Sequence, residues 1–314
     1  MQARQRAKQG KIDDSRNLET MINSGESGAY EALQLYRSRA IRAYAKGEHM
    51  SAVKTTVDGC IKLIKGTYLA SAAELCNQLI EFLDESQLDI DTPEVREIVL
   101  SVDDALVIAV LNGETDSDNN KEDANALKLR KDFLKGAVKW TKTYSGKDFG
   151  DSALHLRLGG AMWSTETKGA IFHFVAGESP FELARKISDT MGSNMDKEVI
   201  LRRDRNILSA VCHFLALENL RDANEVFNLF KKAQKARGNS VDTKLVLFCT
   251  QLLECCRRDA APLYKQLLGA ITIDLEQWQG ENITSLLNGP IGTKFFGIQP
   301  KVHPMMQMMQ QFLI

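Results

Sequence analysis

Few residues in this chain have types and spacings that could perform acid–base or nucleophilic chemistry. Cys212 and His213 are adjacent, but consecutive side chains on a helix point about 100° apart, so they cannot act as nucleophile and base. His155 and His173 stand among apolar neighbours, as core or capping histidines do. The usual phosphate-loop, dinucleotide, zinc-protease and nucleophile-elbow motifs are absent. The sequence therefore predicts a protein that is not an enzyme and has neither cofactor nor metal.

The cysteines favour the same interpretation. All six fall at apolar positions of predicted helices, and none belongs to a Cys-x-x-Cys pair of the kind found in metal and redox sites. We expect reduced, buried thiols, which agrees with a cytosolic protein. They are Cys60, Cys76, Cys212, Cys249, Cys255 and Cys256.

Charged residues near the start of the chain are the other candidates for a site. Arg39, Arg42 and Lys46 share one face of a helix predicted over residues 29–45, and Arg37 lies close by. Glu74 belongs to the outer face of a later helix. The chain has 40 Lys+Arg against 41 Asp+Glu, so its totals do not suggest nucleic acid or anionic lipid as the main partner. A charged face is usually only solvated, so a binding role needs further support.

Helices must position these side chains. Leu33, Tyr36, Ala40 and Ala43 recur at i, i+3, i+7 and i+10, a core-facing stripe, and similar stripes continue to about residue 272. Six prolines, 44% apolar residues and no sustained alternating segment argue for a nearly all-helical protein. After two helices near 53–64 and 72–83, we predict helices at 93–111, 124–144, 150–164, 167–176, 180–190, 196–216, 219–236, 241–257 and 259–272.

A repeated three-residue motif, glycine followed two residues later by a ring-bearing residue, predicts how these helices are arranged. It occurs at one constant spacing as Gly28-Ala-Tyr30, Gly47-Glu-His49 and Gly66-Thr-Tyr68. The alternative is that three turns are alike by chance. We interpret each glycine as a helix stop and each ring as packing on the next helix. Two helices then make a hairpin of about 38 residues, between the tetratricopeptide and HEAT periods. The fold class expected is an all-α, right-handed solenoid of such hairpins, with a mobile acidic loop at 112–123 and a short β-hairpin or loop at 235–243.

The block from Phe133 to Phe174 is specific enough to indicate a family. It resembles the scaffold subunit of the guided-entry-of-tail-anchored-proteins (GET) pathway, which in animals belongs to the transmembrane-domain recognition complex. The likeness extends to residues 27–32 and 294–301, so it spans most of the chain. The matching residues are Phe133, Ala137, Lys139-Trp140-Thr141, Gly146, Phe149-Gly150-Asp151, Leu154-His155, Trp163, Ala170 and His173-Phe174.

This resemblance implies an adaptor that bridges two partners. The N-terminal half, residues 1–150, would dock a targeting ATPase dimer through Arg37, Arg39, Arg42, Lys46 and Glu74. The C-terminal half, residues 151–314, would grip the N-terminal segment of a ubiquitin-like protein. That protein would recruit a tetratricopeptide co-chaperone carrying a tail-anchored client. The residues that we expect to contact the ubiquitin-like protein are Phe248, Leu252, Phe295, Phe296, Ile298, Met305 and Phe312.

Two other features bear on this function. Met305, Met308, Met309 and Phe312 have helical spacing, and the tail that carries them either caps the solenoid or contacts a partner; either way we expect it to be ordered. The basic residues near Arg4 precede no apolar run, and no stretch approaches the roughly 20 apolar residues of a membrane span. We therefore expect a cytosolic protein with no direct membrane insertion.

One rival function is a tetratricopeptide-like co-chaperone that binds the C-termini of heat-shock proteins. It would need cations projecting into one groove from successive hairpins, whereas Lys54, Lys62 and Lys65 belong to a single predicted helix. A second rival is a coat or regulatory-particle subunit. It would need a C-terminal winged-helix pattern, and no strand pattern is visible after residue 240.

Overall fold

The computed structural model describes residues 18–114, 120–144, 146–189, 196–276 and 283–299. The chain divides into two compact units, Met1–Met162 and Trp163–Ile314. Compared with the halves predicted at residue 150, the first unit also includes the helix Ser152–Met162. The described residues form helices and loops without any strand, so the all-α fold class is confirmed. Residues 237–243 form a loop between two helices and not a β-hairpin.

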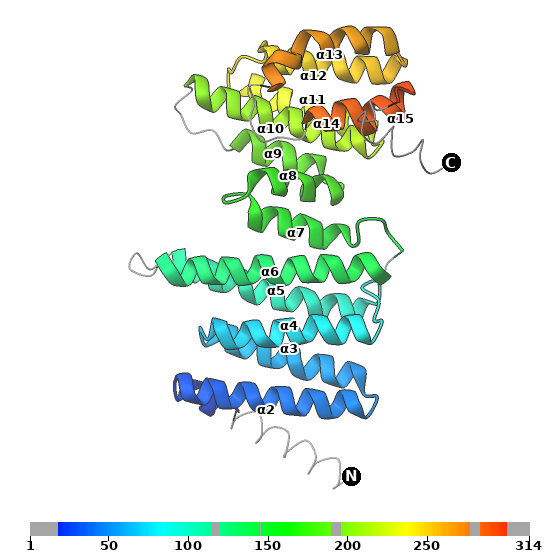
Figure 1. Ribbon diagram of the computed structural model, residues 1–314. Helices are drawn as coiled ribbons and strands as arrows, with labels where there is room; N and C mark the ends of the chain where they lie inside the picture. The colour runs from blue at the N-terminus through cyan, green and yellow to red at the C-terminus, as the bar shows by residue number, and fades with distance from the viewer. Residues whose placement is uncertain (1–17, 115–119, 145, 190–195, 277–282, 300–314) are drawn as a thin grey trace, which may run out of the picture. The chain divides into compact units, whose positions relative to one another are not determined.

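The first unit is a stack of helices in chain order (Figure 1). After a short helical segment at 18–23 come α2 (Glu26–Ala45), α3 (His49–Lys65), α4 (Leu69–Glu85), α5 (Pro93–Glu114), α6 (Asn120–Tyr144) and α7 (Ser152–Met162). Helix α3 packs against α2, α4 and α5, while α6 packs against α4, α5 and α7. Because α5 reaches Glu114 and α6 begins at Asn120, helix occupies both ends of the loop that the sequence predicted at 112–123.

The second unit is built around one long central helix. Its elements are α8 (Thr167–Ala176), α9 (Pro180–Asp189), α10 (Lys197–Ala216), α11 (Leu220–Ala236), α12 (Lys244–Arg258), α13 (Ala261–Glu276), α14 (Ile283–Leu286), the π-helical turn η1 (Leu287–Ile291) and α15 (Gly292–Phe296). Helix α10 contacts α8, α9, α11 and α12. The chain then returns, so that α14 and η1 also pack on α10 (Figure 1).

The two tryptophans that match the family differ in burial. Trp140 is 2% exposed and lies in the core of the first unit, where a large ring anchors packing. Trp163 is only half-buried, with its ring edge-on to Phe174 at 5.9 Å between centroids. Asp151, another matching residue, caps α7, since its Oδ1 accepts a hydrogen bond from the Leu154 N–H at 3.0 Å.

Successive helices end in the same backbone motif. Gly47, Thr67 and Gln87 follow α2, α3 and α4 at equal intervals along the chain, each with a positive φ. The next N–H in each case reaches back to the carbonyl five residues earlier, at 3.0 Å in Glu48 and Tyr68 and 3.3 Å in Leu88. In the second unit Glu178, Glu218 and Asp259 have the same conformation after α8, α10 and α12. The repeating unit of the first unit of the chain is thus one helix with its turn. Its length in residues is slightly greater than the spacing of the glycine motif.

Two of the three predicted glycine stops are wrong in detail. Gly28 lies inside α2, where a Cβ would overlap the Met21 carbonyl oxygen and the Ser24 Oγ. Gly66 has a φ of −81°, and Thr67 takes the left-handed conformation instead, with a φ of 66°. A Cβ on Gly66 would lie 3.0 Å from Ile22 Cγ2. Close packing against segment 18–23 therefore explains why glycine occupies both positions. The ring of Tyr30, predicted to pack on the next helix, is 57% exposed.

Candidate functional site

The structure brings together two of the five residues predicted to dock the ATPase. Arg37 of α2 and Glu74 of α4 form an ion pair, with 2.9 Å between Nη1 and Oε2. Their side chains remain 41% and 50% exposed. A pair this exposed contributes little to stability, so both charged groups stay accessible to a partner.

The other three basic residues lie on the opposite flank of α2. Two residues along a helix correspond to a rotation of about 200°, which places Arg39 away from Arg37. Arg42 is exposed and its Nε donates to the Ser38 carbonyl at 3.0 Å. Lys46 is exposed just after the last turn, where a cation is favourable beside the helix C-terminus. The predicted basic face is therefore Arg39, Arg42 and Lys46, and the expectation that Arg37 lies beside it is wrong.

Inside this face, a chain of polar contacts ties α2 to α3. The Tyr36 hydroxyl donates to Asp58 Oδ2 at 2.8 Å, and Asp58 pairs with Lys62 at 3.2 Å. Burial, and then the nearby Asp58 carboxylate, raises the pKa of Tyr36 far above its ordinary value of 10.0. Tyr36 is 2% exposed. These contacts hold the basic flank of α2 in a fixed position relative to α3.

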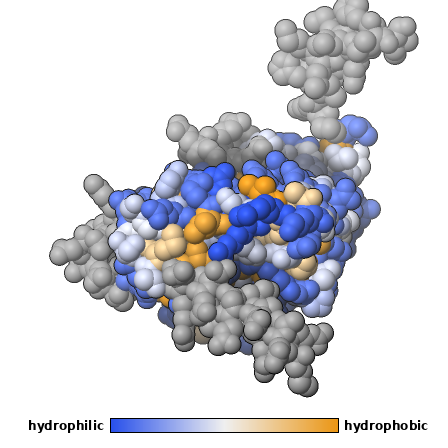
Figure 2. Space-filling view, turned by 90° about the horizontal axis from the view of Figure 1, so that it is seen from below, coloured by the Kyte–Doolittle hydropathy of each residue, from blue (hydrophilic) through white to orange (hydrophobic). Residues whose placement is uncertain are grey.

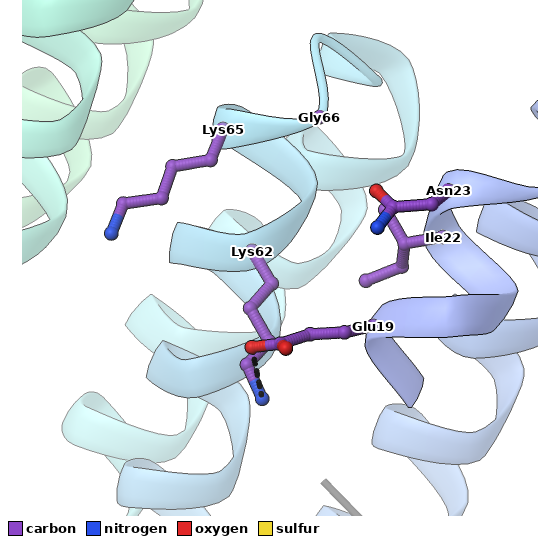
Figure 3. A pocket seen from close by; sticks show the side chains of 6 residues that line it. All are labelled: Glu19, Ile22, Asn23, Lys62, Lys65 and Gly66. Atoms are coloured by element: carbon purple, nitrogen blue, oxygen red, sulfur yellow. Dashed lines mark ion pairs between the residues drawn. The ribbon is translucent and has the colours of Figure 1, made fainter. Parts of the chain in front are cut away.

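A pocket of about 210 Å³ opens where segment 18–23 meets the end of α3. Figure 3 shows Glu19 reaching toward Lys62, 3.9 Å away, while Lys65 extends in another direction. Lys62 also pairs with Asp58, so its charge is already balanced. The carbonyl end of α3 disfavours an anion beside Lys65. The pocket is lined by Glu19, Ile22, Asn23, Lys62, Lys65 and Gly66, a mixture that matches no catalytic arrangement.

The histidines and cysteines considered for chemistry have structural positions. His155 is buried, and its Nε2–H donates to the Phe149 carbonyl at 2.8 Å. Burial lowers the pKa of His155, and of His213 as well. His213 Nδ1 bonds the Ser209 carbonyl of its own helix at 2.8 Å rather than the neighbouring thiol of Cys212. All six cysteines are free and buried, as predicted, and burial raises the pKa of Cys256 to about 12.

The residues predicted to contact a ubiquitin-like protein fall into three groups. Phe248 and Leu252 are 3% and 0% exposed, so their side chains belong to the core of the second unit. Phe295, Phe296 and Ile298 are half-buried, and Phe296 stacks on Tyr264 at 4.1 Å between centroids. Met305 and Phe312, with the rest of the Met-rich tail and its expected order, lie outside the described residues.

Sequence reasoning missed the exposed apolar residues of the same region. Leu247 on α12 and Leu263 on α13 are 50% and 51% exposed. Helical periodicity could have found Leu247, because it shares a face with Gln251, Glu254 and Arg258 rather than with the apolar residues around it. The same test would have assigned Phe248 and Leu252 to the buried face.

Helices that pack in chain order and end in the same turn define the class of helical-repeat proteins. Residues 46–313 match the family model described as Golgi to ER traffic protein 4. The chain belongs to this family, which confirms the resemblance seen in the sequence.

Individual relatives agree with this assignment. The chain is 25% identical over 292 residues to Protein GET4 of Arabidopsis thaliana, covering 88% of each chain. It is 23% identical over 297 residues to the Golgi to ER traffic protein 4 homolog of Homo sapiens, covering 87% of this chain and 76% of the relative. The fold is similar to a crystal structure of C. therm. Get4, with a TM-score of 0.67, 22% identity and coverage of 96% and 95%. Among the helices of the described residues, none has the length and apolar character needed to cross a membrane.

Proposed function

We propose that this protein is a cytosolic scaffold in the post-translational targeting of tail-anchored membrane proteins to the endoplasmic reticulum. It bridges a targeting ATPase dimer and a ubiquitin-like protein, which recruits a tetratricopeptide co-chaperone loaded with client. The observation that carries this proposal is membership of the Golgi to ER traffic protein 4 family over residues 46–313. In this role the chain is an adaptor and performs no catalysis.

The ATPase docks on the first unit, at the outer surface of α2 and α4. Arg42 and Lys46 are exposed on one flank of α2, and the pair of Arg37 and Glu74 lies on the other. Charges at the rim of an interface chiefly set the association rate and its dependence on salt. Arg39 belongs to the same flank as Arg42 and Lys46.

The ubiquitin-like protein binds the second unit, near the returning segment. Phe295, Phe296 and Ile298 are half-buried there and offer part of their apolar surface. Lys294 of this segment contacts the turn after α10, where its Nζ lies 2.8 Å from Glu218 Oε1. Phe248 and Leu252 are buried in the core of this unit and are not part of the proposed contact surface. Met305 and Phe312 remain predicted contacts of the same partner.

A native pull-down of the tagged full-length chain from its own cytosol, with identification by mass spectrometry, tests this function. The expected result is a stoichiometric ubiquitin-like protein together with the ATPase dimer. Recovery of heat-shock proteins or coat subunits in their place would overturn the proposal. Reversing the charges of Arg42 and Lys46 to glutamate should remove the ATPase and keep the ubiquitin-like protein. Lys128 and Lys135 of α6, both exposed, provide a control with the same change in net charge.

A further inference from the structure

Two serines of the second unit have an arginine three residues before them. Ser188 follows Arg185 and Ser240 follows Arg237, and no other serine or threonine in the sequence has an arginine at this spacing. Hydrophilic side chains cover much of the surface, as Figure 2 shows for the end at which α2 lies, so a nearby cation alone would not single out a hydroxyl group. The spacing is more specific, because protein kinases of one class bind an extended substrate whose basic side chains enter acidic pockets at fixed distances from the reacting hydroxyl.

Burial separates the two serines. Ser188 belongs to α9 and is 1% exposed, so its hydroxyl cannot enter the active site of another protein. Ser240 is exposed in the loop 237–243, between α11 and α12. Lys235, also exposed, adds a second cation five residues before Ser240. Ser240 therefore combines the basic spacing with an accessible hydroxyl, and Ser188 does not.

The contacts of the loop leave the Ser240 hydroxyl at the surface. Its Oγ accepts a hydrogen bond from the Asp242 N–H of the same loop at 3.2 Å. Its backbone carbonyl accepts one from Nη2 of the buried Arg203 at 3.3 Å. The loop is thus anchored to the core through its main chain, and a group added to Oγ need not displace a buried contact.

Arg237 has to be released before another protein can bind it. Its Nη2 lies 2.6 Å from Asp189 Oδ1, and its Nη1 donates to the Ser188 carbonyl. The Arg237 and Asp189 side chains are 41% and 47% exposed. Ion pairs this exposed contribute little to stability, so an acidic pocket can take the place of Asp189.

We propose that Ser240 is phosphorylated by a protein kinase with an acidic substrate cleft, which binds Arg237 and Lys235. An aspartate of the kinase accepts the hydroxyl proton, and Ser240 Oγ forms a bond to the γ-phosphorus of ATP. The bond from that phosphorus to the oxygen bridging the β- and γ-phosphates breaks, and ADP leaves. The phosphate adds about two negative charges ahead of the first turn of α12, where the helix dipole favours an anion. This proposal does not depend on the scaffold function.

The test incubates the folded full-length chain with ATP and the catalytic subunit of cAMP-dependent protein kinase, and locates the phosphate by tandem mass spectrometry. Ser240 should be labelled and Ser188 should not. Arg237→Ala should slow the labelling of Ser240 about ten- to a hundredfold, because it removes a charge-assisted contact with the kinase. Arg185→Ala is the matched control, since Arg185 also lies beside Asp189, with 3.6 Å between Nη1 and Oδ2, and the rate should stay unchanged.

A merely structural effect of Arg237→Ala would act in the opposite direction, because a released loop exposes Ser240 further. An unchanged or faster rate in Arg237→Ala, or equal slowing in Arg185→Ala, would therefore overturn the proposal. Labelling at other residues while Ser240 stays unmodified would do the same. The Ser240 phosphopeptide should also be present in the chain isolated from its own cells under phosphatase inhibition, and its absence there would contradict the assignment.

Discussion

Arg37 of α2 and Glu74 of α4 pair across 2.9 Å while remaining 41% and 50% exposed. The pair joins two helices that are not consecutive, and it combines a basic and an acidic residue that the family resemblance assigns to one binding site. An intact pair offers a partner no net charge at this point. We therefore expect Glu74→Gln, which removes the carboxylate that balances Arg37, to speed association with an acidic partner severalfold at low salt. Stopped-flow association with the ATPase dimer measures this rate.

The control for that variant is Glu94→Gln. Glu94 of α5 pairs with Lys54 of α3 at 2.5 Å and is 52% exposed, so the change in net charge is the same but lies away from α2. Both variants should change the free energy of unfolding by less than about 1 kcal/mol, as is usual for exposed pairs. Equal acceleration by both would show that total charge matters and that the position of Glu74 does not.

Thr67 follows α3 with a φ of 66°, a conformation that is strained for a β-branched residue. Thr67→Gly should therefore stabilise the protein by about 1 kcal/mol, since glycine adopts this conformation without the clash of a Cβ. Urea unfolding followed by circular dichroism measures the change. The reverse substitution at the equivalent position, Gly47→Ala, should cost about 1 kcal/mol, because Gly47 has a φ of 78°. A loss of stability in Thr67→Gly would mean that the threonine side chain contributes more than the strain.

The position of the helices was predictable because each buries an apolar stripe with the helical period. Predicted ranges such as 167–176 and 180–190 agree with α8 and α9 almost to the residue. The helix ends were less predictable. Thr67, Gln87, Glu178 and Glu218 take the left-handed conformation without the glycine that usually marks it. In each case the N–H of the next residue donates to the carbonyl five residues earlier, which closes the turn.

The candidate sites were predictable only at the level of a helix face. Opposite flanks for Arg37 and Arg39 follow from helical geometry alone. The pairing of Arg37 with Glu74 does not, because it depends on how α4 is set against α2. Phe248 was predicted to contact a partner, yet its side chain is 3% exposed and belongs to the core. An apolar side chain can contact a partner only where the helix leaves it exposed, as it leaves Leu247.

A buried carboxylate links three helices of the first unit. Asp103 of α5 is 0% exposed and lies 2.7 Å from Arg130 of α6 and 2.7 Å from Arg157 of α7. Asp103→Asn keeps the shape but leaves two arginines without their buried partner. We expect a loss of roughly 3–5 kcal/mol in the free energy of unfolding, measured by urea titration. Asp104→Asn is the matched control, because Asp104 contacts Arg157 at 2.6 Å but is 62% exposed. Equal losses in the two variants would contradict a special role for the buried carboxylate.

His155 should make the stability of the first unit depend on pH. Burial lowers its pKa below the ordinary value of 6.5, while in the unfolded chain the ring titrates normally. Below about pH 6.5 the unfolded state therefore binds more protons than the folded state, so the free energy of unfolding falls as the pH falls, until the folded pKa is reached. Above about pH 6.5 the ring is neutral in both states, so this contribution is constant.

His155→Gln tests the effect, because glutamine retains an N–H that can donate to the Phe149 carbonyl, 2.8 Å from Nε2 in the wild type. The urea midpoint of the wild type, measured between pH 5 and pH 8, should fall more steeply on the acid side than that of the variant. His213, whose pKa burial also lowers, leaves a smaller acid dependence in the variant. Parallel curves for the two proteins would mean that His155 binds its proton equally well in the folded and unfolded states.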